Sequence, residues 1–396
     1  MPYPGARMTE SKPNAVAASD SPSPICAIGA SAGGVRALQD FFAAIDDDLG
    51  LAYVVVIHLS PDHPSQLSAI LAGRTRMPVE QVDDAPKFRP NCVYVIAPDR
   101  ELVIEGDKLA ARPITQPRSK RAPIDMFFRS VAAARGDGLA VVLSGSGSDG
   151  ALGIRAIKEA GGVIFVQDPN EAEYPTMPQS AIATGVADFV APVLTLVQRI
   201  VEVVHSKRAL RQLKEDEAEQ DLAKITRLLR ARMGHDFSQY KRTTVMRRVV
   251  RRMQVTRHDS IGNYIDYLRG APEEARELLA DLLISVTNFF RDRNAFGTLA
   301  EKAIQPIFEN LEENMGVRVW VVGCATGEEA YSVAMLLLEQ AASSNVHVPI
   351  QIFASDLDEK ALTVAREGRY PKAIAADVSE GRLQRFFVED VTPKAG

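Results

Sequence analysis

The chain has 396 residues, more than one domain usually holds, so two or three domains are expected. Hydrophobic residues make up 46% and charged residues 24% of the sequence, which excludes a chain that is disordered throughout. The net charge of −5 excludes a protein that is basic overall, so any anion-binding surface has to be local. Three widely spaced cysteines without a CxxC pair exclude a disulfide scaffold and a zinc ribbon.

Membrane and secretory signals are absent from the sequence pattern. No apolar run approaches the roughly 18 residues that a membrane span needs. The first thirty residues lack the apolar stretch of a secretory signal. We therefore expect a cytoplasmic protein that is not inserted in a membrane.

The first part of the chain changes character at Ile25. Residues 1–24 hold five prolines and many small polar residues, which predicts a disordered leader. From there, short apolar runs alternate with amphipathic helical patterns, and we predict a doubly wound parallel-sheet α/β domain over residues 25–205. Residues 92–114 read as a hairpin insertion with turns at Pro98-Asp99 and Gly106-Asp107.

The rest of the chain predicts three more segments. Residues 206–222 are almost all charged or helix-forming, which is typical of a solvated helical linker. The pattern over 223–300 is helical throughout and predicts a small all-α domain. Residues 301–396 contain two strand–helix units, the start of a Rossmann-like domain. Two units are fewer than a doubly wound sheet needs, so we expect this domain to be incomplete in the chain or completed by another one.

A candidate nucleophile follows the first predicted strand. The sequence GASAGG at residues 29–34 leaves a buried strand and opens a helix, which is the setting of the G-x-S-x-G nucleophile elbow. There Ser31 would stand at a helix N-terminus, where free N–H groups can stabilise an oxyanion. A phosphate-binding or purely structural turn fits the same motif.

Two further strand ends supply a candidate base and a candidate acid. His58 closes the strand YVVVIH, and Asp149 follows the strand LAVVL. Parallel strands end at one edge of a sheet, so Ser31, His58 and Asp149 should meet there as a serine triad. His63 is a competing base, and Asp149 is also placed to cap the helix that follows it. The order Ser–His–Asp differs from that of the α/β-hydrolases.

Residues 25–204 resemble the catalytic domain of the CheB-like chemotaxis protein-glutamate methylesterases. The resemblance is carried by AIGASAGG, VIHLSPDHPSQL, NCVYVIAPD, PIDMFFRSVA, VVLSGSGSDGALGI and QDPNEAEYPTMPQSAI. It implies Ser31, His58 and Asp149 as catalytic residues and hydrolysis of γ-glutamyl methyl esters on chemoreceptors without a cofactor. Glutamine deamidation is the related activity in this family. Ala32 and Ser146 depart from the family's common residues, and no phospho-receiver pattern precedes the first strand.

A basic stripe stands out in the helical segment. Residues 241–252 read KRTTVMRRVVRR, with six basic residues and no acidic one. On a helix, one face is apolar, and the arginines gather on the other: Arg247, Arg248, Arg251 and Arg252. The stripe predicts a solvated face or a docking site for an acidic protein helix. Nucleic acid is a third alternative, but no aromatic residue interleaves with the arginines.

A second chemical pattern lies near the C-terminus. The run ISVTNFFRD at residues 284–292 precedes a strand that leads through a Gly323…Gly327 loop into a helix. Such a loop is similar to a nucleotide-cofactor loop, although it is not a G-x-G-x-x-G motif. Asp356 follows the next strand, where an acidic residue can bind ribose hydroxyls or cap the following helix.

Residues 222–390 resemble the CheR-like chemotaxis receptor methyltransferases. These enzymes transfer a methyl group from S-adenosylmethionine to receptor glutamates. The resemblance implies that Thr287 and Arg291 contact the methionine end of the cofactor, Glu328 its amino group and Asp356 its ribose. It also places the family's basic receptor-docking helix on Arg247–Arg252. The family's later cofactor-binding strands would follow Gly396, so we expect the methyltransferase region to be incomplete.

Taken together, the sequence predicts a chemoreceptor-modifying enzyme: a serine methylesterase fused to an incomplete methyltransferase, acting on chemoreceptors or related signalling proteins. One alternative is a non-catalytic signalling scaffold that docks an acidic receptor helix through the arginine stripe. Another is a nucleic-acid methyltransferase, which the acidic pI of about 5.8 disfavours.

Overall fold

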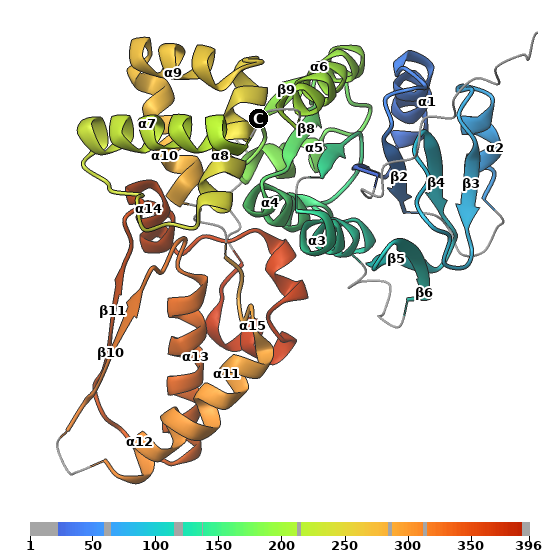
Figure 1. The fold of residues 1–396 in the computed structure, drawn as a ribbon. Coiled ribbons are helices and arrows are strands. Elements are labelled where there is room, and N and C mark those ends of the chain that lie inside the picture. Colours follow the sequence, from blue (N-terminus) through green and yellow to red (C-terminus); the bar gives the residue numbers. More distant parts are fainter. Residues whose placement is uncertain are drawn as a thin grey trace, which may run out of the picture.

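The structure is a computed structural model that describes residues 23–58, 65–114, 122–136, 138–211, 215–283, 287–311 and 315–389. Most of the predicted leader, and the competing base His63, lie outside these residues. The buried apolar side chains form one large cluster in the first region, one among the middle helices, and a third with a small satellite near the C-terminus. Figure 1 shows these regions in blue to green, yellow and orange to red.

A seven-stranded parallel sheet forms the centre of the first region, in the order β3-β4-β2-β1-β7-β8-β9. Its central strands are apolar on both faces because both faces are covered, and β1 and β2 are buried at every position. The doubly wound α/β prediction is therefore confirmed. The strands are β1 (Ile25–Ala30), β2 (Ala52–Ile57), β3 (Val79–Val82), β4 (Cys92–Ile96), β7 (Leu139–Val142), β8 (Val163–Gln167) and β9 (Phe189–Ala191).

The strand order places three loops at one edge of this sheet. The chain leaves β1 for β2 on one side and later returns to β7 on the other side of β1. Gly29 pairs with Val56 of β2 and with Val142 of β7. The loops after β1, β2 and β7 therefore emerge together, at the kind of crevice where open α/β sheets bind ligands.

Helices cover both faces of the sheet. On one side α1 contacts α6, and on the other α3 contacts α4 (Figure 1). The shorter α2 packs against α1 and β3, and α5 packs against α4 and β8. Their bounds are α1 (Gly34–Ala44), α2 (Leu67–Ala72), α3 (Pro123–Arg135), α4 (Ala151–Ala160), α5 (Thr176–Ala183) and α6 (Val193–Arg211).

The expected hairpin insertion is only partly correct. Strands β5 (Arg100–Glu105) and β6 (Lys108–Pro113) form an antiparallel pair that turns at Gly106-Asp107, as predicted. The preceding strand β4 instead joins the main sheet between β2 and β3. All five of its residues are buried, because a strand inside a parallel sheet is covered on both faces.

The middle region contains α7 (Glu215–Met233), α8 (Arg242–Thr256), α9 (Ile261–Gly270) and α10 (Pro272–Leu283). Their shared core includes Val245, Val249 and Met253 from the predicted apolar face of α8. The segment expected to be a single helical linker, residues 206–222, takes in the end of α6 and the start of α7, with residues 212–214 outside the description. No described helix is both long and apolar enough to cross a membrane.

The C-terminal region holds a two-stranded parallel sheet among the described residues, β10 (Val317–Val322) beside β11 (Ile350–Ser355). Its helix α13 packs on one side of the pair. The face that carries Trp320, Val322 and Phe353 is at least half exposed. The helical elements are α11 (Arg293–Leu299), the π-helix η2 (Ala300–Ile304), α12 (Gln305–Glu309), α13 (Glu328–Ser343), α14 (Glu359–Glu367), the 3-10 helix η3 (Lys372–Ala376) and α15 (Glu380–Phe386).

Candidate active sites

Ser31 lies on a tight turn between β1 and α1. Its N–H donates to the Ser144 carbonyl at 3.0 Å, and its own carbonyl accepts from the Gly34 N–H at 2.9 Å. A Cβ atom at Gly34 would stand 2.7 Å from the Ala30 Cβ, and Gly33 has φ +69°. The turn therefore needs both glycines, and it presents Ser31 at the N-terminus of α1.

His58 and Asp149 meet across the same edge of the sheet. The distance from His58 Nε2 to Asp149 Oδ2 is 3.3 Å, and the side chains are 36% and 9% exposed. Although both Ser31 and His58 are described, no hydrogen bond joins them. Strand order thus brings all three predicted residues to one edge, but only the histidine–aspartate contact is formed.

Asp149 has a structural role that differs from the expected one. Its Oδ1 accepts from the Asp125 N–H at 2.8 Å and its Oδ2 from the Ile124 N–H at 3.0 Å, in the first turn of α3. The residue that caps α4 is Gly150, with φ +92° and no side-chain cap. Asp149 therefore caps α3, a helix that precedes it by about 25 positions, and not the helix that follows it. Two backbone donors at a helix N-terminus orient the carboxylate that faces His58.

Asp125 is a site residue that the sequence reasoning missed. Its side chain is 3% exposed, and its Oδ1 accepts from the Gly153 N–H of α4 at 2.6 Å. Burial, together with the nearby charge of Asp149, raises the pKa of Asp125 to about 8. The only sequence signal was an acidic residue in the first turn of an otherwise apolar helix, PIDMFF. Asp125 links the start of α3 to the start of α4 behind Asp149.

The wall beside Ser31 is formed by the loop after β7. The Ser144 hydroxyl donates to the Ala32 carbonyl at 3.1 Å and accepts from the Tyr174 N–H at 3.0 Å. A Cβ atom at Gly145 would lie 2.9 Å from the Ser31 Cβ, so only glycine lets the loop come this close. Ser146, one of the two family departures, is exposed on this loop.

The arginine stripe on α8 is mostly buried, which contradicts its predicted exposure. Arg248, Arg251 and Arg252 are buried, at 3%, 1% and 8% exposure, so the expected exposed docking face is wrong for these three. Arg251 pairs with Asp188 and Asp281, and Arg252 forms two bonds of 2.6 and 2.9 Å to Glu274.

Arg247 and Arg248 donate to the last carbonyls of α4. Arg247 donates to the Ala160 carbonyl at 3.2 Å, and Arg248 donates to the Lys158 carbonyl at 2.6 Å and to that of Glu159. Cations are favourable at this negative end of a helix. Helical periodicity identified the apolar face of α8, but it could not show that the opposite face packs on the first region. All four arginines have acceptors within the chain, so the predicted docking of an external acidic partner loses its basis.

A cavity of about 680 Å³ contains three of the four predicted cofactor residues. Thr287, Arg291 and Asp356 line it, together with Gly323 and Ala325 of the loop after β10. Asp356 accepts from the Ala325 N–H and from the Asp358 N–H, each at 2.8 Å, so it also fixes that loop. The helix after it, α14, is capped by the Asp358 side chain, which removes the alternative assignment of Asp356 as a helix cap.

The fourth predicted residue, Glu328, opens α13 and is 2% exposed. It does not line this cavity, although the next residue, Glu329, does. The Glu328 Oε2 accepts from the Thr326 hydroxyl at 2.5 Å. Gly327 before it has φ +97°, and a Cβ atom there would stand 2.9 Å from the Tyr370 hydroxyl. The glycine thus permits the tight entry into α13 that the motif predicted.

Two residues of α4 contact Glu328 and Arg291, and no sequence pattern predicted these contacts. The Arg155 Nη1 lies 3.3 Å from the Glu328 Oε1, and the Arg291 Nη2 lies 2.5 Å from the Glu159 Oε1. Glu159 is also part of the cavity wall. Contacts between separate domains leave no local trace in a sequence.

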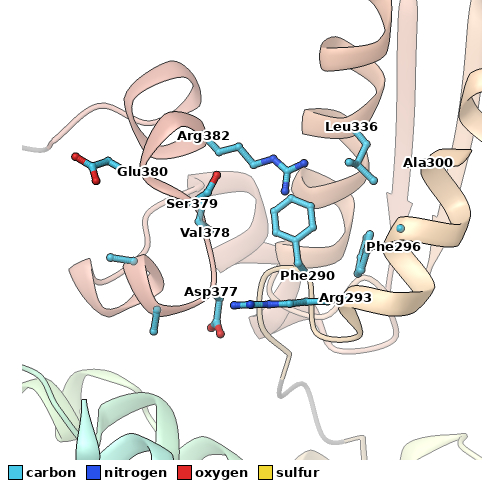
Figure 2. Close-up of a pocket in the computed structure, with 13 residues that line it drawn as sticks. Phe290, Arg293, Phe296, Ala300, Leu336, Asp377, Val378, Ser379, Glu380 and Arg382 are labelled. Carbon is cyan, nitrogen blue, oxygen red and sulfur yellow. The ribbon is translucent and has the colours of Figure 1, made fainter. Parts of the chain in front are cut away.

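A different cavity, of about 570 Å³, lies between α11 and the η3–α15 segment (Figure 2). Arg382 stacks over the Phe290 ring at 4.3 Å and binds Glu339 through two bonds of 2.7 and 2.8 Å. Of the described residues, none of the predicted cofactor contacts lines this cavity. The cavity of Thr287, Arg291 and Asp356 is therefore the candidate cofactor site.

The residues of that site fit an amino-acid nucleotide cofactor. Arg291 offers a cation for a carboxylate, and Glu328 offers an anion for an ammonium group. Asp356, at the carboxyl end of β11, offers acceptors to ribose hydroxyls. The charges of these residues and the position of Asp356 at a strand end fit the carboxylate, ammonium and ribose groups of S-adenosylmethionine.

Comparisons with known proteins divide the chain in the same way as the three regions. Residues 26–200 match the family CheB methylesterase, residues 220–283 the all-alpha domain of CheR methyltransferase, and residues 285–395 its SAM binding domain.

Three relatives are similar to different parts of the chain. A putative protein-glutamate methylesterase/protein-glutamine glutaminase of Leptospira interrogans is 33% identical over 165 residues, 41% of this chain and 86% of the relative. Chemotaxis protein methyltransferase 2 of Pseudomonas aeruginosa is 31% identical over 177 residues, 45% of this chain and 61% of the relative. An uncharacterized 104.1 kDa protein in the hypE 3′ region of Rhodobacter capsulatus is 36% identical over 346 residues, which cover 81% of this chain. This match spans only 36% of the Rhodobacter protein.

Proposed function

Because this chain belongs to the CheB methylesterase family and carries the two CheR methyltransferase domains behind it, we propose that it removes and adds methyl groups on chemoreceptor glutamates. The esterase half acts on γ-glutamyl methyl esters and, by the same chemistry, on receptor glutamines. The substrates are cytoplasmic segments of chemoreceptors or of related signalling proteins. The observation that carries the proposal is the contact between His58 and Asp149 beside the Ser31 turn.

In the esterase reaction, the Ser31 hydroxyl attacks the ester carbonyl while His58 takes its proton. Since Nε2 of His58 faces Asp149, Nδ1 is the nitrogen left for Ser31. The N–H groups at the start of α1 stabilise the oxyanion, as the helix N-terminus favours negative charge. Collapse of the intermediate breaks the bond to methoxide, which leaves as methanol with the proton from His58. Water then hydrolyses the acyl-serine to the glutamate carboxylate and restores Ser31.

Asp149 contributes orientation rather than proton transfer. Two N–H groups of α3 fix both its oxygens, so the carboxylate cannot turn away from His58. This holds the imidazole in one tautomer and stabilises the imidazolium that forms in the transition state.

In the methyltransferase half, Thr287, Arg291, Glu328 and Asp356 would hold S-adenosylmethionine, whose sulfonium would supply the methyl group. Arg291 would bind the carboxylate of its methionine end, and Glu328 would bind the ammonium. Asp356 would accept from the ribose hydroxyls. The role of these residues would be to bind and orient the cofactor beside the receptor carboxylate.

The esterase proposal is tested by methanol release from a methyl-esterified receptor fragment. The parent should release methanol, and Ser31→Ala should release none above the uncatalysed rate while keeping the circular dichroism of the parent. Ser68→Ala, on α2 of the same region, is the matched control and should retain full activity. Full activity in Ser31→Ala would overturn the assignment.

The methyltransferase proposal is tested by calorimetric binding of S-adenosylhomocysteine, which needs no receptor. Arg291→Ala and Asp356→Ala should each weaken binding by about tenfold or more, since a charge-assisted bond is worth roughly 1.5–3 kcal/mol. Arg293→Ala, two positions along the chain and outside the cavity, should bind like the parent. Equal affinities for all four proteins would reject these residue assignments.

A further inference from the structure

Helix α4 of the first region contacts Arg291 and Glu328, two of the three charged residues assigned to the cofactor site. Arg155 reaches Glu328 at 3.3 Å and the Thr326 hydroxyl at 3.1 Å. Glu159 reaches Arg291 at 2.5 Å. The two α4 residues are four positions apart, so they lie on one face of the helix and point to the same neighbour.

These contacts reproduce the charges of an amino-acid ligand. The methionine end of S-adenosylmethionine carries one ammonium and one carboxylate. Arg155 presents a cation to Glu328, and Glu159 presents a carboxylate to Arg291. Glu328 and Arg291 are therefore each already paired with a group of the same sign as the one they would bind in the cofactor.

The position of α4 at this site is fixed by further bonds. On its C-terminal side, Arg247 and Arg248 of α8 hold its last carbonyls. Beside it, Arg129 of α3 makes two bonds of 3.0 and 3.1 Å to Asp377 of the C-terminal region. The Glu328 carboxylate is 2% exposed, so its pair with Arg155 is shielded from water. The Arg155–Glu328 pair is thus part of a packed junction, whereas the Arg291 and Glu159 side chains are 52% and 30% exposed.

We propose that α4 occupies the amino-acid end of the cofactor site, so that S-adenosylmethionine binds only when Arg155 and Glu159 release Glu328 and Arg291. This inference rests on the proposed methyltransferase function. It assigns to two residues of the esterase domain a role in setting the cofactor affinity of the other domain. Their role is competitive, because each carries the charge of the ligand group that it opposes.

The test is calorimetric binding of S-adenosylhomocysteine to the full chain, which keeps the amino-acid end of the cofactor. Glu159→Gln removes the charge that opposes the ligand carboxylate and should strengthen binding about two- to fivefold, the range expected for a partly exposed ion pair. Arg155→Gln leaves the buried Glu328 without its cation, and it should strengthen binding on the order of tenfold.

Matched controls come from an exposed ion pair on α10. Glu273 and Arg276 pair at 2.7 Å, outside the cofactor cavity, with side chains 79% and 63% exposed. Glu273→Gln and Arg276→Gln change the net charge by the same amounts and should leave the affinity unchanged. They separate a local competition from a general effect of charge.

The outcomes distinguish the two proposals. Tighter binding by Glu159→Gln and Arg155→Gln, but not by the controls, supports the inference, as does binding that appears only in these variants. Unchanged or weaker binding by both variants, with clear binding by the parent, overturns the inference and leaves the cofactor site in place. No binding by the parent or by any variant overturns the cofactor site itself, and the inference with it.

Discussion

The two α/β regions of this molecule use the same local device in very different surroundings. In each, a strand ends in a glycine turn that leads into a helix: Ser31 follows β1, and Glu328 opens α13 after β10. Strand β1 has six buried residues and a hydrogen-bonded neighbour on each side. Strand β10 alternates buried and exposed residues and pairs only with β11 among the described strands.

This difference shows that a turn motif and its support are separate properties. A parallel strand is apolar on both faces when helices cover both, and β10 is covered on one. In the first region, the candidate catalytic residues follow strands of that region's own sheet. The C-terminal region holds two of its candidate residues through contacts with α4 of the first region.

The largest effect is expected at the best-supported site. Asp149→Asn should lower the rate of methanol release by roughly 10⁴-fold, because His58 loses the partner that sets its tautomer. The same change should cost only about 1 kcal/mol of stability, as a weakened cap of α3. Initial rates and urea unfolding measure the two effects, and a rate within tenfold of the parent would contradict the role of Asp149.

A matched pair of phenylalanines tests the comparison of the two sheets. Phe165 of β8 is fully buried, whereas Phe353 of β11 is 50% exposed. Phe165→Ala should reduce the free energy of unfolding by about 3–5 kcal/mol. Phe353→Ala should reduce it by about 1 kcal/mol or less, mainly through its contact with Arg318. Urea denaturation of both variants measures the two losses in the free energy of unfolding. Equal losses would mean that the exposed face of β11 is covered in solution.

A buried arginine tests the junction between the regions. Arg251→Met removes the cation between Asp188 and Asp281, whose side chains are 4% and 6% exposed. The two buried carboxylates then keep Lys158, at 3.2 and 3.3 Å, but lose the cation that lies between them, and we expect a loss of about 3 kcal/mol. The exposed Arg269→Met on α9 is the control and should change stability by less than about 0.5 kcal/mol. Thermal unfolding of the two variants gives the comparison, and similar melting temperatures would reject the role of Arg251.

The smallest effect concerns pH. Burial raises the pKa of Asp125 to about 8, well above its value of about 3.9 in an unfolded chain. Between these values the folded state binds a proton that the unfolded state has lost, so stability falls as the pH rises and levels off above about pH 8. Relative to Asp125→Asn, the parent should lose at most about 1.4 kcal/mol between pH 6 and pH 7. Parallel pH profiles for the two proteins would show that Asp125 does not titrate in this range.

Whether a feature could be predicted from the sequence depends on how far apart along the chain its interacting residues lie. Ser31 and the glycines around it were accessible because the motif is local. The placement of Ser31, His58 and Asp149 at one edge of the sheet followed from the rule that parallel strands end there, although only the contact between His58 and Asp149 is formed. The partners of Asp149 in α3 were not accessible, since a capping bond across 24 or 25 residues leaves no periodic signal.

The helical region shows the same limit more strongly. Periodicity correctly placed Val245, Val249 and Met253 in a core. It placed Arg251 in solvent, whereas the packing of α8 against α6 and α10 buries it completely between two carboxylates. Arg155 and Glu159 were invisible for the same reason, because their partners lie more than 130 residues away.

The exposed Trp320 has a practical consequence for following this molecule. It is the single tryptophan of the sequence, it is 68% exposed, and its indole N–H donates to the Ser355 hydroxyl at 3.0 Å. Ser355 lines the candidate cofactor cavity. A water-exposed indole emits at long wavelength, and its emission shifts or is quenched when a bound group changes its surroundings. The chain thus carries one tryptophan fluorophore, which reports on the C-terminal cavity, while the first region contributes no tryptophan emission.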